Sequence, residues 1–438
     1  MRTRVLIPSG VLGLGFSREA LARGVAAKPD IICIDGGSTD SGPFYLGTGT
    51  SKYARATCKA EWRQLMVARE ALGVPLVIGS CGTCGADAMV DWMMEITREL
   101  AKELGQSLKV ARLYSDQPLE RVKAAELRAL GGINPTLRGN IVALAGAEQM
   151  QAALETGADI VLAGRMTDTA VISTLPLMAG AHKGAAWHGA KIGECGALCS
   201  TNPTSGVVII DFDESGFTVE AMEEGATCTP HTVSAHMLYE NADPFILHEP
   251  GGHLDVTKAR YAAQGRRVRV EGSLWVPSPD YCVKLEGAAL VGFQTTVLAL
   301  LRDPRYVAHA QEWVSKLSAF LSVQISEHFS GESAVEFRII GLNATLGDLE
   351  TGDAIPNEVG VLGIITAETQ AQASEIAKFI NPHILHFPLT KNEELPTFAF
   401  PYSPAQTDRG PLYEFTLNHV MPLAHPMDAF RLETEVLA

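Results

Sequence analysis

Four short loops of the sequence combine Gly, Ser, Thr and Asp, residue types that hold anions or transfer protons. They span residues 9–15, 35–42, 79–87 and 164–168. Each follows an apolar run of the kind that forms a buried strand. Because the carboxyl ends of parallel strands meet at one edge of a sheet, we expect the four loops to gather there and form the functional site.

The second loop, DGGSTDSG, carries two carboxylates, Asp35 and Asp40. Two carboxylates at a strand end can share a cation, or their pKa values can be pushed apart to give one acid and one base. Ser38 and Thr39, which lie between them, are candidates for binding substrate. The same residue types also form turns capped by side-chain hydrogen bonds, and the sequence leaves both interpretations open.

The last loop, GRMTD, places Arg165 at the end of an expected strand and Thr167 and Asp168 at the start of a helix. Arginine beside free helix N–H groups is suited to bind a carboxylate or phosphate. Asp168 would then act as helix cap or as general base. The structural alternative is an ion pair between Arg165 and a loop acid such as Asp168.

The third loop, GSCGTCGAD, contains the pair Cys81 and Cys84 with the C-x2-C spacing of redox and zinc motifs. Cys195 and Cys199 could complete a four-sulfur zinc set. Structural zinc sites usually combine two tight C-x2-C pairs, whereas this second pair has C-x3-C spacing. The spacing therefore favours neither zinc nor thiol redox chemistry.

The small residues of the same loop predict a different role from its cysteines. Ser80, Gly82 and the N–H groups of the following helix are placed to contact an anion. Cys81 lies near the start of that helix, a position that lowers the pKa of a thiol, so Cys81 is a candidate nucleophile. No histidine adjoins it in the sequence, and simple packing is the alternative role.

Two further motifs resemble a cofactor-binding and a metal-binding motif, but neither matches completely. The first loop has the spacing G-x-x-G-x-G, the reverse of the dinucleotide fingerprint, so we expect a tight turn and no redox cofactor. Residues 248–255 contain His248, His253 and Asp255. They could bind a divalent metal, but a surface turn explains them as well. The metal requirement therefore stays open.

The elements that position these loops follow from the hydrophobic pattern. Over residues 1–205, short apolar runs alternate with helix-period segments, which predicts an α/β domain with a doubly wound, mostly parallel sheet. Helices are expected at 86–104, 118–130 and 147–155. Residues 206–438 alternate like half-buried antiparallel strands interrupted by two helices, which predicts a second, α+β domain.

Composition narrows the classes of partner. The chain has 50 acidic and 35 basic residues, a formal net charge of −15, and no block of Lys or Arg. Nucleic acid and anionic membranes, which require a concentrated positive surface, are therefore not expected as partners. We expect a cytoplasmic protein with reduced thiols, because eight scattered cysteines occur without a signal peptide or membrane span.

Long segments of the chain resemble the AtuA-like family, which is named for acyclic terpene utilisation. The segments are CIDGGSTDSGP, GSCGTCGAD, ETGADIVLAGRMTDTA, GECGA, MLYENADPFILHEPGGHLDVTKARY, FRIIGLNATLGDLE and LNHVM, and they extend over nearly the whole chain. The residues that match the family are Asp35, Ser38, Arg165, Asp168, Glu194 and Asp255. The resemblance implies a role in the breakdown of acyclic terpenoids and branched acyl compounds.

The resemblance also implies a partner. Many relatives carry a small ferredoxin-like domain at the C-terminus, or are encoded beside a small protein of that kind. We therefore expect a small ferredoxin-like partner protein, and also a homo-oligomer.

Residues and resemblance together predict an enzyme that adds or eliminates water next to the carbonyl of a small carboxylate or acyl-CoA. Arg165 and loop N–H groups would hold the anionic substrate. Acid and base would come from Asp35, Asp40, Asp168 or Glu194. Two alternatives remain: a non-catalytic binding or scaffold subunit in a complex with the small partner, and an NAD-dependent dehydrogenase.

Overall fold

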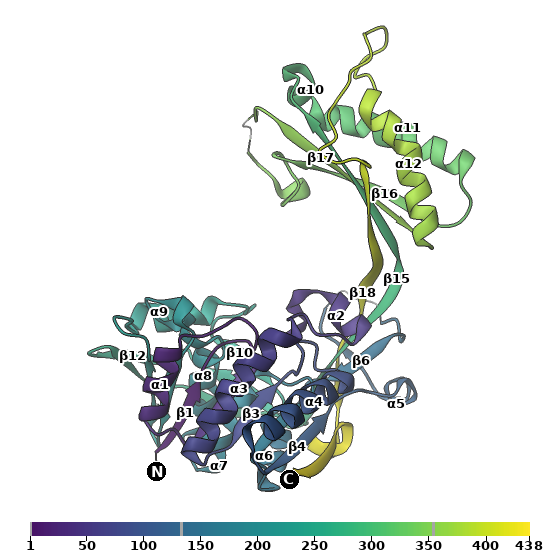
Figure 1. Cartoon of the computed structure of the whole chain (residues 1–438). Coiled ribbons are helices and arrows are strands. Elements are labelled where there is room, and N and C mark those ends of the chain that lie inside the picture. The colour runs from purple at the N-terminus through teal and green to yellow at the C-terminus, as the bar shows by residue number, and fades with distance from the viewer. Residues whose placement is uncertain (1, 132–134, 353–354) are drawn as a thin grey trace. The chain divides into compact units, whose positions relative to one another are not determined.

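The computed structural model describes residues 2–131, 135–352 and 355–438. The chain divides into two compact units, one formed by Met1–Ala289 with Phe415–Ala438 and the other by Leu290–Glu414. It belongs to the mixed α/β class, with one large mixed sheet and smaller antiparallel sheets (Figure 1). Among the described residues, no helix has the length and apolar character needed to cross a membrane.

Five parallel strands form the centre of the first unit. In spatial order they are β1 (Thr3–Ile7), β2 (Ile31–Asp35), β3 (Leu76–Gly79), β7 (Ile160–Ala163) and β4 (Leu108–Tyr114). All residues of β2, β3 and β7 are buried. Burial on both faces explains why these strands are continuously apolar in the sequence, and the predicted parallel sheet is confirmed.

Helices cover both faces of this sheet (Figure 1). One face packs against α1 (Arg18–Ala26), α3 (Arg55–Leu72) and α4 (Asp87–Leu104), and the buried side chains there include Trp62 and Met93. The opposite face packs against a second set of helices, α6 (Ala147–Glu155), α7 (Asp168–Met178) and α8 (Lys183–Gly193). The sheet is therefore doubly wound, as expected from the alternation of apolar runs and amphipathic helices.

Antiparallel strands extend the sheet at both edges. At one edge β8 (Val208–Phe212) pairs with β1, and β9 (Gly216–Ala221), β13 (Arg267–Glu271) and β12 (Arg260–Gln264) follow in that order. At the other edge β19 (Arg431–Leu437) pairs with β4. The predicted domain boundary between residues 205 and 206 does not coincide with the division into units, because the strands after residue 205 continue the sheet of β1.

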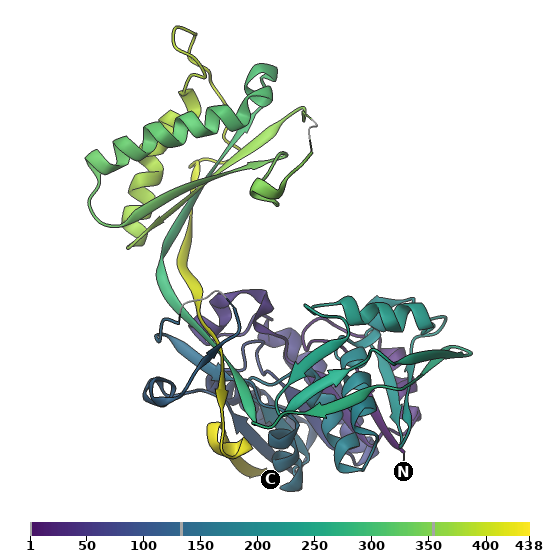
Figure 2. The same ribbon diagram turned by 180° about the vertical axis from the view of Figure 1, so that it is seen from behind.

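The second unit consists of a four-stranded sheet with two long helices. Its strands lie in the order β16 (Ser333–Ile340), β17 (Val359–Ala367), β15 (Cys282–Leu301) and β18 (Gln406–Pro422). Helices α11 (Ala310–His328) and α12 (Gln370–His386) pack on the sheet and on each other, around a core that includes Trp313 (Figure 2). In chain order this is a β-α-β-β-α-β unit with the first strand between the third and the last, which is the ferredoxin-like arrangement.

The remaining elements are short. They are α2 (Pro43–Thr48), α5 (Leu119–Ala124), β5 (Arg128–Ala129), β6 (Asn140–Ala143), α9 (Pro230–Ala235), β10 (Ile246–Glu249), β11 (Gly252–Asp255), β14 (Leu274–Pro277) and α10 (Pro304–Ala308). Of these, β10, β11 and β14 form a separate three-stranded antiparallel sheet in that order. The predicted helices at 86–104 and 147–155 are confirmed, each within one residue. The predicted helix at 118–130 is wrong beyond Ala124, because the next residues form β5 and pair with β18.

Candidate functional site

A pocket of about 310 Å³ lies in the first unit, beside the loops that follow β2 and β7 and at the start of α7. It contains six of the residues proposed from the sequence, namely Ser38, Asp40, Arg165, Thr167, Asp168 and Glu194. Two of the four expected loops therefore meet at one place. The carboxyl ends of parallel strands position them, as in other open α/β sheets.

Arg165 is the most firmly held side chain of this pocket. Its Nε donates to Glu286 Oε2 at 2.9 Å, and its Nη1 donates to Ser80 Oγ and to the Met166 carbonyl, both at 3.1 Å. Asp168 Oδ1 lies 3.9 Å from Nη1. Among the described residues, Nη2 is the guanidinium nitrogen that forms no hydrogen bond, so it is the donor that remains for a substrate oxygen.

Glu286, on β15, is the buried counter-ion of Arg165 and was not proposed from the sequence. It accepts hydrogen bonds from Arg165, from Thr39 Oγ1 at 2.9 Å and from Lys284 Nζ at 2.8 Å. Burial raises the pKa of Glu286, but the charges of Arg165 and Lys284 outweigh it and lower the pKa to about 2. Thr39, proposed as a substrate ligand, therefore serves this buried network and does not line the pocket.

Asp168 is the first residue of α7, and its side chain is 26% exposed to the pocket. Burial raises its pKa to about 6, and the carboxylates of Asp40 and Glu240 add to the effect against the opposing charges of Arg165 and Lys191. Thr167 provides the helix cap, because its side chain accepts from the Ala170 N–H. Asp168 is therefore free of the capping role considered from the sequence and is available as a base.

Asp35 does not line the pocket, whereas Asp40 does. Asp35 is buried, one of its carboxylate oxygens accepts from the Gly37 N–H at 2.9 Å, and the other has no partner among the described residues. Burial and the nearby Asp168 raise the pKa of Asp35 well above its ordinary value. Asp40 is exposed and accepts from Ser38 Oγ at 2.9 Å. Their proposed catalytic roles stay predictions.

Lys191 and Glu194 form a buried ion pair on the last turn of α8. Burial raises the pKa of Glu194 to about 8, against the opposing charge of Lys191. Burial opposes the charged form of Lys191, but Glu194 outweighs it and raises the pKa of the lysine. The spacing Lys191-x-x-Glu194 is typical of a helix ion pair, and that signal was available in the sequence.

Glu249, at the end of β10, is a further titratable carboxyl group of the pocket. It accepts a hydrogen bond from Thr169 Oγ1, and its Oε2 is buried without a partner among the described residues. Burial raises the pKa of Glu249 to about 7, against the hydrogen bonds from Thr169 and Thr167 that lower it. The sequence pattern around residue 249 drew attention to its histidines and not to this glutamate.

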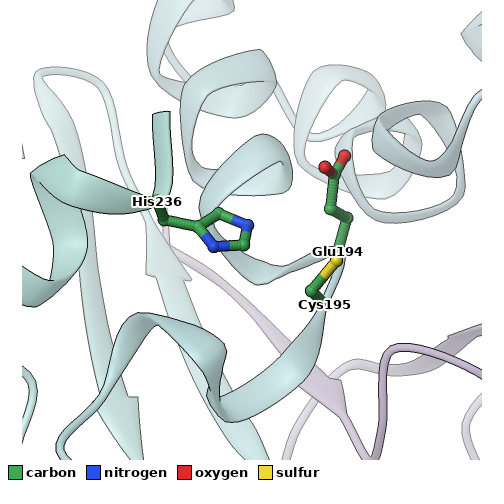
Figure 3. Close-up of side chains that lie close together, drawn as sticks. All are labelled: Glu194, Cys195 and His236. Carbon is green, nitrogen blue, oxygen red and sulfur yellow. The ribbon is translucent and has the colours of Figure 1, made fainter. Parts of the chain in front are cut away.

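Glu194, Cys195 and His236 bring three different donor atoms together beside the pocket (Figure 3). One atom from each side chain lies within 4.8 Å of the other two. His236 begins a short 3₁₀ helix after α9, is buried, and points its ring toward Glu194 and Cys195. Burial and the charge of Lys191 lower the pKa of His236 to about 4, so the imidazole is neutral at pH 7.

The loop at residues 79–87 does not form the expected anion cradle. Its Ser80, Cys81, Thr83 and Gly85 N–H groups all donate to backbone carbonyls, and Ser80 itself is fully buried. A Cβ at Gly82 would lie 2.5 Å from Met89 Sδ, so this glycine serves close packing. The loop instead holds Arg165 in place, because Ser80 Oγ accepts a hydrogen bond from Arg165 Nη1.

Cys81 is not favoured as a nucleophile by its surroundings. Its side chain is fully buried outside the pocket lining, and burial raises the pKa of the thiol, opposite to the shift expected from a helix start. Within residues 2–131, 135–352 and 355–438, one group of three metal-ligand side chains assembles, and Cys81, Cys84 and Cys199 do not belong to it. The four-sulfur zinc set considered from the sequence is therefore not formed.

The motif at residues 248–255 is a β-hairpin, close to the surface turn considered from the sequence. His248 pairs with His253 across β10 and β11, with ring centroids 5.5 Å apart. The Asp255 carboxylate accepts from the Thr257 N–H and hydroxyl. The first glycine loop also serves packing, since a Cβ at Gly10 would lie 2.8 Å from the Cys195 Cα.

Comparison with known proteins gives one positive result. The model of the family described as acyclic terpene utilisation family protein AtuA matches residues 75–392, which is more than half of the chain. The matched range contains the pocket residues Arg165, Asp168, Glu194 and Glu249. No curated protein and no solved structure matches the chain.

Proposed function

The chain belongs to the AtuA family of acyclic terpene utilisation proteins, and we propose that it adds water to, or eliminates water from, a small carboxylate or acyl thioester. One observation carries this proposal. The same pocket contains three carboxyl groups whose pKa values are raised toward neutrality, Asp168, Glu194 and Glu249, and of these Glu194 is already paired with Lys191. Carboxyl groups tuned in this way are typical of general acid and base catalysis.

We assign different roles to the two carboxyl groups Asp168 and Glu249. Asp168, with a pKa of about 6, is mostly ionised at neutral pH and would remove the proton from the carbon next to the carbonyl. Glu249, with a pKa of about 7, retains a proton in part of the molecules and would give it to the departing hydroxyl group. The C–O bond then breaks and water leaves. Hydration is the same sequence reversed.

Arg165 is the residue that we assign to the substrate carbonyl or carboxylate. Glu286 and Ser80 fix its guanidinium so that Nη2 remains available in the pocket. A preorganised donor at the oxygen where negative charge develops stabilises the transition state without reorganisation. The fixed position of Arg165 is thus as important as its charge.

The direct test is an assay of the purified chain with short and branched enoyl thioesters and with 3-hydroxyacyl thioesters and 3-hydroxy acids. Turnover in D₂O should place deuterium on the carbon next to the carbonyl, because Asp168 exchanges its proton with solvent. Asp168→Asn and Glu249→Gln should each lower kcat by about 10²–10⁴-fold. Ser41→Ala, a change in the neighbouring loop outside the pocket lining, should leave it unchanged.

The pH dependence of kcat/KM provides a second test of the same roles. Asp168 must be ionised to act as base, so activity in the dehydration direction should rise as pH increases through about 6. Glu249 must be protonated to act as acid, so activity should fall above about 7. These two groups are surrounded by other charged side chains, namely Arg165, Lys191, Asp40, Glu240 and Glu194. The apparent pKa values of the two limbs therefore belong to the coupled set of groups and not to Asp168 and Glu249 alone. Loss of the alkaline limb in Glu249→Gln is expected, and its persistence would exclude Glu249 as the acid.

The two alternatives drawn from the sequence predict other outcomes. A scaffold subunit would show no turnover alone and would gain activity with a small co-purifying protein. A dehydrogenase would quench or enhance nicotinamide fluorescence on titration. Either result, combined with unchanged behaviour of Asp168→Asn, would replace the proposal.

A further inference from the structure

We propose that Glu194, Cys195 and His236 bind one zinc ion beside the pocket that Glu194 lines, with the fourth coordination position left open. The three side chains come from adjoining segments of the first unit, namely the end of α8, the residue before a 3₁₀ helix at Gly196–Cys199, and the start of a second 3₁₀ helix at His236–Leu238 (Figure 3). The inference that zinc binds depends only on these three side chains. A catalytic use of the ion depends, in addition, on the proposed function.

The spacing of the donor atoms suits a zinc ion. One atom of each side chain lies within 4.8 Å of the other two. Zinc bonds to nitrogen, oxygen and sulfur are about 2.0–2.3 Å long, so ligand atoms around one ion are separated by less than about 4.6 Å. Small side-chain rotations therefore close the site. Imidazole, thiolate and carboxylate form the mixed donor set that zinc accepts, and three protein ligands with a free fourth position are typical of catalytic zinc.

His236 supplies the independent evidence for a ligand at this place. The residue is only 5% exposed, and its Nε2 has no hydrogen-bond partner among the described residues. The ring points toward Glu194 and Cys195 (Figure 3). A buried imidazole nitrogen without a partner carries an uncompensated desolvation cost, which coordination to a metal removes.

The surroundings hold the three ligands in place. Lys191 Nζ donates to Glu194 Oε1, so we assign the other oxygen, Oε2, to the metal and the lysine to the role of orienting partner. The backbone of Cys195 lies against Gly10, where a Cβ would approach the Cys195 Cα to 2.8 Å. His236 stacks on Tyr239 with ring centroids 5.5 Å apart. Each ligand thus has a neighbour that limits its movement.

A divalent cation would also resolve the charge balance of the pocket. Its lining contains six carboxyl groups, Asp40, Asp168, Glu194, Glu240, Asp243 and Glu249, but only two cationic side chains, Arg165 and Lys191. Both cations are already paired with buried carboxylates. An anionic substrate would therefore meet a predominantly negative pocket. Bound zinc would supply Lewis-acid polarisation of a substrate oxygen.

The binding test uses no substrate, so its result is independent of the proposed function. The full chain is treated with chelator, incubated with ZnCl₂ or CoCl₂ and desalted. Elemental analysis should find one zinc ion per chain. The cobalt form should show the visible bands of tetrahedral Co²⁺ and a near-ultraviolet thiolate-to-cobalt charge-transfer band. Absence of stoichiometric zinc, or of the charge-transfer band, would overturn the proposal.

Variants assign the ligands. Cys195→Ser should abolish the charge-transfer band, and His236→Gln should weaken zinc affinity by more than about 100-fold, beyond the loss typical of an outer-shell change. Cys282→Ser, at a similarly half-buried thiol, and His231→Gln, at an exposed histidine of α9, should bind zinc as the wild type does. A charge-transfer band that persists in Cys195→Ser would place the thiolate elsewhere and refute the assignment.

A measurement on the wild-type chain covers the case in which a variant fails to fold. Alkylation followed by peptide mass spectrometry reports each thiol separately. Zinc should protect Cys195 from iodoacetamide and leave the modification of Cys282 unchanged. Equal modification of Cys195 with and without zinc would refute the proposal. Zinc binding without turnover would retain the metal site and reject the proposed reaction.

Discussion

At the scale of single residues, Glu286 determines whether Arg165 stays in place. The two side chains are 5% and 6% exposed and form a direct ion pair. Removing one partner of a buried pair leaves an uncompensated charge and costs about 3–5 kcal/mol. We expect Glu286→Gln to lower the free energy of unfolding by that amount in urea denaturation, and to lower activity because Arg165 loses its position.

The matched control for this prediction is Glu120→Gln. Glu120 also pairs with a cation, Lys123, but its side chain is 84% exposed. Exposed pairs contribute about 0–1 kcal/mol, so the control should be nearly as stable as the wild type. Equal stability of both variants would mean that Asp168 or Asp35 takes over the charge of Arg165.

The sequence predicted the site residues that follow strands and missed those that reach the pocket from elsewhere. Arg165 and Asp168 were found because a strand followed by a helix start places them at a sheet edge by local rules alone. Glu249 lies on a hairpin, Glu286 on a long strand and His236 at the start of a short 3₁₀ helix, and tertiary packing determines the contacts of all three elements. No local pattern specifies such contacts, since the sequence separation from Glu286 to Arg165 is 121 residues.

At the scale of elements, the segment GSCGTCGAD supports the strand end that presents Arg165. Gly85 has a φ of +64°, and a Cβ there would lie 2.3 Å from the Arg165 backbone nitrogen. Gly73, the residue after α3, has nearly the same φ of +67° but open space around it. Alanine substitutions at these two glycines therefore distinguish the free-energy cost of a left-handed backbone conformation from the cost of a steric clash.

We expect Gly73→Ala to lower the free energy of unfolding by about 1–2 kcal/mol, the cost of a left-handed conformation. Gly85→Ala should lose that amount and a further roughly 1–3 kcal/mol from overpacking, together with activity. Urea denaturation and the assay of the proposed reaction measure both effects. Similar losses for the two variants would show that the loop yields to the added methyl group and does not fix Arg165.

Helices and strands with a strong local sequence pattern were predictable. Those that depend on pairing with a segment far away in the sequence were not. The helix at Asp87–Leu104 has a strong amphipathic stripe and a stop at Gly105, and it forms as expected. The segment after Ala124 has helical composition, yet Arg128–Ala129 pairs with β18 almost 300 residues later. Pairing with a neighbouring strand gives the backbone N–H and C=O groups hydrogen-bond partners, whereas the end of a short, exposed helix would leave them bonded to water. Tertiary pairing therefore prevails over local helix propensity.

At the scale of the whole molecule, the first unit is formed by two separate stretches of chain. Phe415–Ala438 returns to the first unit after the second is complete, and β19 closes the edge of the large sheet at β4. A change in local pattern near residue 205 does not reveal this arrangement, because the antiparallel strands that follow still join β1. The ferredoxin-like arrangement of Leu290–Glu414 likewise follows from strand order, which local patterns do not encode.

The buried carboxyl groups should give the whole molecule an unusual dependence of stability on pH. Asp35, Asp168 and Glu249 have raised pKa values in the folded state, so the folded chain binds more protons than the unfolded chain between about pH 4 and 7. The contribution of these three groups to the free energy of unfolding must then fall as pH rises through that window, whereas His236, whose pKa is lowered to about 4, contributes in the opposite sense between about pH 4 and 6.5. Glu286 also acts in the opposite sense, because its pKa is lowered to about 2 and its contribution is lost only as pH falls below about 4.

We therefore expect the raised carboxyl groups to contribute a decline in thermal stability from about pH 5 toward pH 8. For Glu249 alone, the shift from 4.5 to about 7 corresponds to roughly 3 kcal/mol of this decline. Melting temperatures measured from pH 3 to 9 in buffers of constant ionic strength test the expectation. Glu249→Gln, which cannot ionise, should flatten the decline between pH 5 and 8, whereas the exposed Glu120→Gln should leave it intact. The same pH dependence in Glu249→Gln as in the wild type would show that Glu249 ionises without cost, and would remove the basis for assigning it as the acid.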